Sequence, residues 1–269
     1  MTLRIIVLIC VIILFTFCSR FNKAQKSDNI EFKYSVAEDY FKKKDYYRAG
    51  VLFEELIPLL RGSDMAENAL FYYAYSQYYQ GQLALSEYHF KRFYELYPRS
   101  ERAEEAFFMH CKSLYLSSPD YTLDQTNTYE AIESIQFFVN RFPNSSYLDE
   151  CNQMIDKCRR KLEIKSFENA KLYYKLGEYK AAIVAFTTFT KSYPDSPKIE
   201  EAIYYKLVSQ YKLAQISIES KKLERYKATL EMYYEFVDKY PKSKLLKEVE
   251  YIYSNANSYI NKFSTINFQ

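Results

Sequence analysis

The sequence predicts an all-α fold: a stack of about five helical hairpins followed by a C-terminal capping helix. Three observations support this fold class. Apolar residues recur at helical spacing along most of the chain, and no segment shows the strict alternation of a half-buried strand. Only 4 of the 269 residues are glycine, which leaves little material for β-turns. Residues 164–196 contain one complete hairpin, in which Gly177 separates two apolar-periodic segments and Pro194 ends the second.

The turn and the end of this hairpin follow from two residues. Gly177 suits a helix-ending position with positive φ, where a Cβ would clash. Pro194 has neither the N–H nor the free φ of a continuing helix, so the second helix must end just before it. Ser196 can then cap the next helix with its hydroxyl, and Pro197 fits the first helical position.

The same spacing recurs five times along the chain. The aligned turn positions are Lys44, Gly81, Thr126, Gly177 and Glu224. Five residues after each turn stands a short side chain: Ala49, Ser86, Ala131, Ala182 and Thr229. Large apolar or aromatic residues follow nine and twelve positions after the turn, and four units carry a proline at position seventeen. This pattern resembles the tetratricopeptide repeat, a hairpin of about 34 residues, although the units here are longer. The predicted architecture is therefore a superhelical α-solenoid.

The helical domain is expected to cover residues 30–263. In chain order, the predicted helices are residues 30–43, 45–60, 64–80, 82–97, 100–117, 127–142, 146–176, 178–193, 198–220, 224–240 and 243–262. Asp45 can cap the second helix, and Pro58 should kink it or end it. The stretch 146–176 contains no Gly or Pro, so it is either one helix or two helices that break near Lys161.

The N-terminus reads as a secretory signal. Arg4 is followed by an apolar run of 13 residues, which is too short to cross a bilayer core of about 30 Å comfortably. The run ends at Cys18, an arrangement that resembles a bacterial lipoprotein signal with a diacylated cysteine. Residues 1–18 are therefore expected to be the signal and residues 19–29 a polar tether. Phe17 stands where such signals usually have a small residue, so an ordinary signal peptide and an uncleaved anchor remain as alternatives.

Nothing in the sequence indicates catalysis. It has no Gly-rich phosphate loop, no GxSxG and no HExxH, and its two histidines and lack of CxxC support neither a metal site nor a cofactor. Cys111, Cys151 and Cys158 are expected to be small core residues. The net charge of +3 argues against nucleic-acid binding. A binding protein is therefore expected rather than an enzyme.

The predicted binding surface is the face formed by the first helices of the hairpins. In the usual phase of the repeat, this face carries an aromatic patch in the first two units, and aromatic rings are typical anchors for an extended peptide. The residues expected there are Tyr34, Phe41, Phe71, Tyr75, Tyr78 and Tyr79. The alternative is that several of these rings simply pack between neighbouring helices.

Taken together, the signal, the five long hairpins and about 250 further residues resemble the YfiO family of outer-membrane lipoproteins, and most closely its Bacteroidota members. The resemblance covers nearly the whole chain after the signal. The segments that carry it are EDYFKKKDYYRAGVLFEELIPLLRG, ALFYYAYSQYYQGQLALSEYHFKRFYELYPRS, SPDYTLDQTNTYEAIESIQFFVNRFPNS and FENAKLYYKLGEYKAAIVAFTTFTKSYPDS.

This resemblance implies a non-catalytic scaffold at the periplasmic face of the outer membrane, anchored through lipid on Cys18. Its implied partners are a BamA-type β-barrel insertase, held mainly by the C-terminal repeats, and unfolded outer-membrane β-barrel proteins, received by the N-terminal repeats. Other assembly lipoproteins are possible partners. Because the repeat serves many functions, a periplasmic adaptor for peptidoglycan or cell-division enzymes is the alternative.

Overall fold

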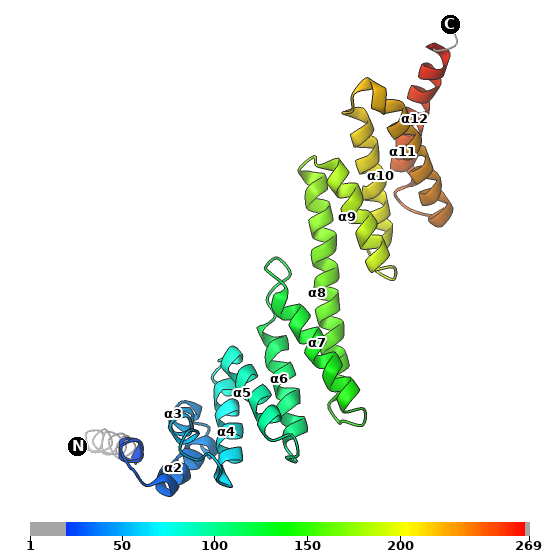
Figure 1. The fold of residues 1–269 in the computed structure, drawn as a ribbon. Coiled ribbons are helices and arrows are strands. Elements are labelled where there is room, and N and C mark those ends of the chain that lie inside the picture. Colours follow the sequence, from blue (N-terminus) through cyan, green and yellow to red (C-terminus); the bar gives the residue numbers. More distant parts are fainter. Residues whose placement is uncertain (1–19, 267–269) are drawn as a thin grey trace, which may run out of the picture. The chain divides into compact units, whose positions relative to one another are not determined.

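The computed structural model describes residues 20–266, and this part of the chain forms helices and turns without any strand (Figure 1). Residues 20–25 are helical. The helices that follow are α2 (Ile30–Lys42), α3 (Tyr46–Leu56), α4 (Met65–Tyr79), α5 (Leu83–Leu96), α6 (Ala103–Ser117), α7 (Thr126–Arg141), α8 (Leu148–Lys175), α9 (Tyr179–Ser192), α10 (Ile199–Gln215), α11 (Glu219–Lys239) and α12 (Leu246–Ile266). The all-α prediction is confirmed, and the open question about residues 146–176 is answered by one continuous helix, α8.

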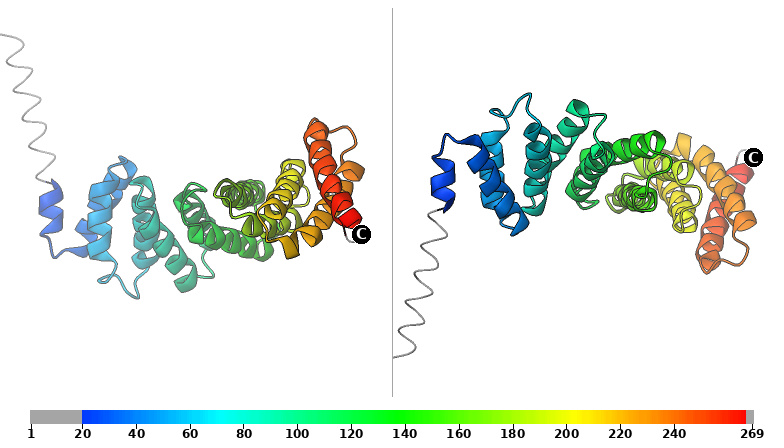
Figure 2. Two further views of the ribbon diagram at one scale, coloured as in Figure 1. Left: turned by 90° about the horizontal axis from the view of Figure 1, so that it is seen from above. Right: turned by 90° about the horizontal axis from the view of Figure 1, so that it is seen from below.

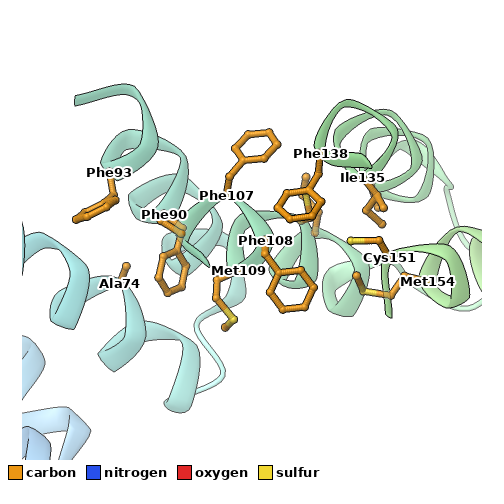
Figure 3. Packing of buried hydrophobic residues seen from close by; sticks show 14 of the residues in the cluster. Ala74, Phe90, Phe93, Phe107, Phe108, Met109, Ile135, Phe138, Cys151 and Met154 are labelled. Atoms are coloured by element: carbon orange, nitrogen blue, oxygen red, sulfur yellow. The ribbon is translucent and has the colours of Figure 1, made fainter. Parts of the chain in front are cut away.

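The chain forms two compact units, residues up to Cys158 and residues from Arg159. In the first unit, each of the helices α2 to α6 packs against the next along the chain (Figures 1 and 2). Its larger core contains Phe90, Phe93, Phe108 and Phe138, and Cys151 of α8 belongs to the same core (Figure 3). In the second unit, α9, α10, α11 and α12 pack in chain order, and Phe167 in the C-terminal half of α8 belongs to that unit's core.

The repeated side chains explain why the hairpins close. All five short residues after the turns are fully buried: Ala49, Ser86, Ala131, Ala182 and Thr229. The residues twelve after the turns are also fully buried: Leu56, Phe93, Phe138, Phe189 and Phe236. A small side chain lets two helices approach closely, and the large ones fill the space beside it. The side chains that recur five and twelve positions after each turn are therefore the ones that form the core of each hairpin.

Three hairpin turns share the left-handed backbone conformation that the sequence predicts for Gly177. Gly177 has φ 78° and Gly81 has φ 74°, and Lys44 adopts φ 62° at the equivalent position. The Asp45 carboxylate then accepts a hydrogen bond from the Arg48 amide, as expected of a helix cap. α3 ends at Leu56, two residues before Pro58.

The other two predicted turn positions are wrong. Thr126 is the first residue of α7, and Glu224 lies inside α11. α10 ends at Gln215, where the Ser217 hydroxyl donates to the Leu213 carbonyl and accepts a bond from Arg225. This local hydrogen bonding ends α10 and lets α11 begin at Glu219, before the predicted start at residue 224. Counting seventeen residues back from the proline therefore does not locate this turn.

A Pro-x-Ser motif closes four hairpins in the same way. Ser100, Ser145, Ser196 and Ser243 each accept a bond from the backbone amide two residues later, at 3.0–3.1 Å. Three of these hydroxyls also donate to a glutamate of the preceding first helix: Ser100 to Glu67, Ser196 to Glu163 and Ser243 to Glu200. Ser196 therefore caps a turn rather than the helix itself. Pro197 does not begin α10, which starts at Ile199.

The segment expected to be a polar tether packs against the first hairpin. Ala24 is fully buried, and the Phe21 ring meets the Tyr40 ring edge to face at 6.0 Å. Arg20 forms an ion pair with Asp39 at 2.8 Å. The two apolar side chains give this short helix something to bury, so residues 20–25 belong to the folded unit rather than to a tether.

Candidate peptide-binding site

Five aromatic rings form a connected strip along α2, α3 and α4. We define the aromatic strip as Phe41, Tyr46, Tyr75, Tyr78 and Tyr79. The Tyr46 and Tyr79 rings stack at 4.4 Å, and Phe41 meets Tyr46 edge to face at 5.5 Å. Tyr79 also contacts Tyr75 at 5.7 Å and Tyr78 at 5.5 Å. Tyr79 is 52% exposed and the other four rings are half-buried, so the strip offers ring surface to a ligand.

Two of the predicted site residues lie in the core instead. Tyr34 is 8% exposed and packs edge to face on Phe53, while Phe71 is 6% exposed and contacts Phe90 and Phe93. Both sit on first helices as predicted, but they point into the interface with the neighbouring helix. We therefore exclude Tyr34 and Phe71 from the candidate site.

Polar groups flank the strip on α6 and α8. The Tyr75 hydroxyl donates to the Glu105 carboxylate. Burial of the phenol and this bond raise the pKa of Tyr75 well above its usual value, so it stays a neutral donor. Lys112 forms an ion pair with Glu150 at 2.9 Å. Together, Glu105, Lys112 and Glu150 give the strip an edge that carries charges of both signs. An aromatic surface with a polar edge suits an amphipathic peptide.

The strip contains one residue that sequence reasoning missed. Tyr46 belongs to the second helix of its hairpin, and only first helices are expected to line the face. It reaches the strip because it is the first residue of α3, directly after the turn at Lys44. Its position two residues after the turn is the available signal, since Tyr179 and Tyr226 stand at the same position in later units.

The described residues carry no arrangement suited to metal chemistry. No group of three or more His, Cys, Asp or Glu side chains between residues 20 and 266 could hold a metal ion. Within the same range, no helix is both long and apolar enough to cross a membrane. The predicted lipidation site, Cys18, lies outside the described residues.

Comparison with known proteins identifies the family. The sequence profile of the YfiO family, described as outer membrane lipoprotein, matches residues 26–183 and 162–260. The chain is 25% identical over 193 residues to the outer membrane protein assembly factor BamD of Caulobacter vibrioides, covering 72% of this chain and 63% of that protein. The BamD protein of Rickettsia prowazekii is 26% identical, covering 67% of this chain and 71% of that protein. The BamD protein of Neisseria gonorrhoeae is 25% identical, covering 73% of this chain and 74% of that protein. The family profile covers most of the helical domain, and the chain belongs to the YfiO family of outer membrane lipoproteins.

Proposed function

We propose that this protein is a non-catalytic scaffold that helps fold and insert outer-membrane β-barrel proteins. Family membership supports this role, since the three relatives above are named outer membrane protein assembly factors. In the proposed arrangement, lipid on Cys18 holds the chain at the periplasmic face of the outer membrane. The first two hairpins receive an unfolded substrate segment, and the C-terminal repeats bind a BamA-type insertase.

The observation that carries the substrate part of the proposal is the aromatic strip. Its neighbouring ring centroids lie 4.4–5.7 Å apart. Side chains on one face of an extended strand recur about every 6.6 Å, so successive apolar side chains of a barrel strand would meet different rings. Ring faces bind any apolar side chain without demanding one sequence, which suits a receptor for many substrates.

The test replaces the exposed ring of Tyr79 and the neighbouring ring of Tyr78. Tyr75 packs against Phe71 and Phe90, so removing it would also disturb the core. We expect Tyr78→Ser with Tyr79→Ser to weaken binding of an extended peptide of alternating apolar and polar residues by about tenfold or more, because each anchor ring contributes on the order of 1 kcal/mol. Fluorescence anisotropy of the labelled peptide measures the affinity.

The matched control removes two exposed tyrosines on second helices. Tyr47 is 67% exposed and Tyr129 is 61% exposed, and neither belongs to the aromatic strip. Tyr47→Ser with Tyr129→Ser should leave the peptide affinity unchanged. Equal affinities for the wild type and the Tyr78/Tyr79 variant would remove the strip from the proposal.

A further inference from the structure

A second candidate site lies away from the aromatic strip, in a cleft between α5 and α7 with α6 as its floor. The cleft has a volume of about 590 Å³ and shares no residue with the strip. Glu87 and Glu95 come from α5, Glu130 and Glu133 come from α7, and the floor includes Phe107 and His110 of α6. The cleft lies entirely within the first compact unit.

The charge of the cleft is unbalanced. Its walls hold four carboxylates and a single cation, Lys91. None of the four glutamate side chains forms an ion pair or a hydrogen bond with another described residue, whereas Glu55 and Glu150 of the same unit pair with lysines at 2.8 and 2.9 Å. Burial, with the Glu130 charge nearby, raises the pKa of Glu87. A bound cation would reduce the repulsion between the Glu87 and Glu130 carboxylates.

His110 adds an acceptor that has no partner. The residue is 4% exposed, and its Nδ1 lies 3.1 Å from the Glu87 carbonyl oxygen. A carbonyl oxygen only accepts, so Nδ1 must carry the proton and donate it. The pKa of His110 is lowered to about 4, chiefly by burial, and the ring is therefore neutral at neutral pH. Its Nε2 then presents a lone pair, and no described residue donates to it.

Aromatic rings complete the lining. Phe137 on α7 is 52% exposed, and its ring meets Phe107 edge to face at 5.3 Å. The Tyr94 ring of α5 also contacts Phe107, with ring centroids 4.6 Å apart. Exposed ring surface beside carboxylates is the setting in which a guanidinium both stacks and forms bidentate bonds.

We propose that this cleft binds an arginine side chain presented by a protein partner. The guanidinium has five donors in one plane, which can serve carboxylates from both walls and the lone pair of His110, while its faces pack on Phe137. A metal ion fits less well, because the acidic and histidine side chains of residues 20–266 form no group of three that could ligate one. Apolar residues beside the arginine would cover the rings of the cleft.

The probe is a fluorescein-labelled nonapeptide with one arginine between leucines, compared with the same peptide carrying citrulline, which is neutral and of the same shape. We expect the full-length protein to bind the arginine peptide at least tenfold more tightly than the citrulline peptide. Glu130→Gln with Glu133→Gln should remove most of this difference; both residues are exposed, so the fold should tolerate the change. His110→Phe, which keeps the ring and removes the acceptor, should weaken binding about fivefold.

The matched control is Glu101→Gln with Glu231→Gln, which changes the net charge equally at exposed glutamates outside the cleft and should leave the affinity unchanged. Circular dichroism verifies the fold of each variant. Equal affinity for the two peptides, or for the wild type and the Glu130/Glu133 variant, would overturn the proposal. So would a failure to bind the arginine peptide at 1 mM. If the protein instead self-associates and the cleft variants abolish the dimer, the occupant is a second copy and the proposed partner is wrong.

Discussion

Phe137 and Phe138 are neighbours on α7 with opposite environments. Phe138 is fully buried among Phe107, Phe108 and Phe142, whereas Phe137 is 52% exposed. Truncating a buried phenylalanine removes its burial and leaves a cavity. We expect Phe138→Ala to lower the free energy of unfolding by about 3–5 kcal/mol, and Phe137→Ala by less than about 1 kcal/mol. Urea denaturation followed by circular dichroism measures both, and similar losses in the two variants would contradict the assigned burial.

His110 makes the stability of the first unit depend on pH. Its folded pKa of about 4 lies below the value of about 6.5 expected in the unfolded chain, so between these values the unfolded chain binds the proton more readily. Its contribution is therefore fully present above pH 6.5 and is lost as the pH falls to 4, up to about 3 kcal/mol. The loss of stability between pH 7 and pH 4 should be smaller in His110→Gln, as measured by urea titrations at both pH values. An unchanged pH dependence would show that His110 is not buried in its neutral form.

The exposure of single aromatic side chains could not be predicted from the sequence. The helical phase correctly assigns Tyr34, Phe71 and Tyr79 to first helices. It does not show that Phe53 and Phe90 cover Tyr34 and Phe71, while Tyr79 keeps half its surface. Exposure depends on which ring the neighbouring helix places opposite, and that placement is set by packing between segments distant in the sequence.

At the scale of the element, the hairpin turns offer an internal comparison. Gly177 has φ 78° with no atom within 4 Å of the position of a Cβ, so Gly177→Ala would suffer only from its backbone conformation. Lys44 already bears that strain at φ 62°. We expect Gly177→Ala to destabilise the protein and Lys44→Gly to stabilise it, each by about 1 kcal/mol. Thermal unfolding midpoints should move in opposite directions, and a shift of the same sign in both variants would contradict this account.

Element ends were predictable where backbone chemistry decides them. Pro194 and Gly177 end their helices through local backbone chemistry, because the proline lacks an N–H and the glycine tolerates positive φ. Thr126 and Glu224 have no such constraint, and their helices begin where capping and tertiary contacts place them. The Pro-x-Ser motif shows the same division. Its serines are visible in the sequence, but the glutamates that accept hydrogen bonds from their hydroxyls lie 33 residues away at two sites and 43 at the third.

At the scale of the whole molecule, the anchor and the partner can be tested together. We expect the wild type to fractionate with membranes and to cross-link to a BamA-type insertase in native membranes. Cys18→Ser should release the protein, because the mature chain would lack its acyl groups. Fractionation and mass spectrometry of the cross-linked material provide the measurement. Membrane retention of the variant would point to another anchor, and recovery of peptidoglycan or division enzymes alone would favour the adaptor over the assembly role.

The cysteines of the described residues all lie in the first unit. Cys111, Cys151 and Cys158 are fully buried in the core of the first unit and form no disulfide, and burial raises the pKa of Cys111 to about 12 and of Cys151 to about 11. Residues 159–269 contain no cysteine. Apart from Cys10 and Cys18, which lie outside the described residues, each cysteine therefore becomes accessible to a thiol-reactive dye only when the first unit opens. The rate at which the dye labels these three thiols would therefore report the opening of the first unit.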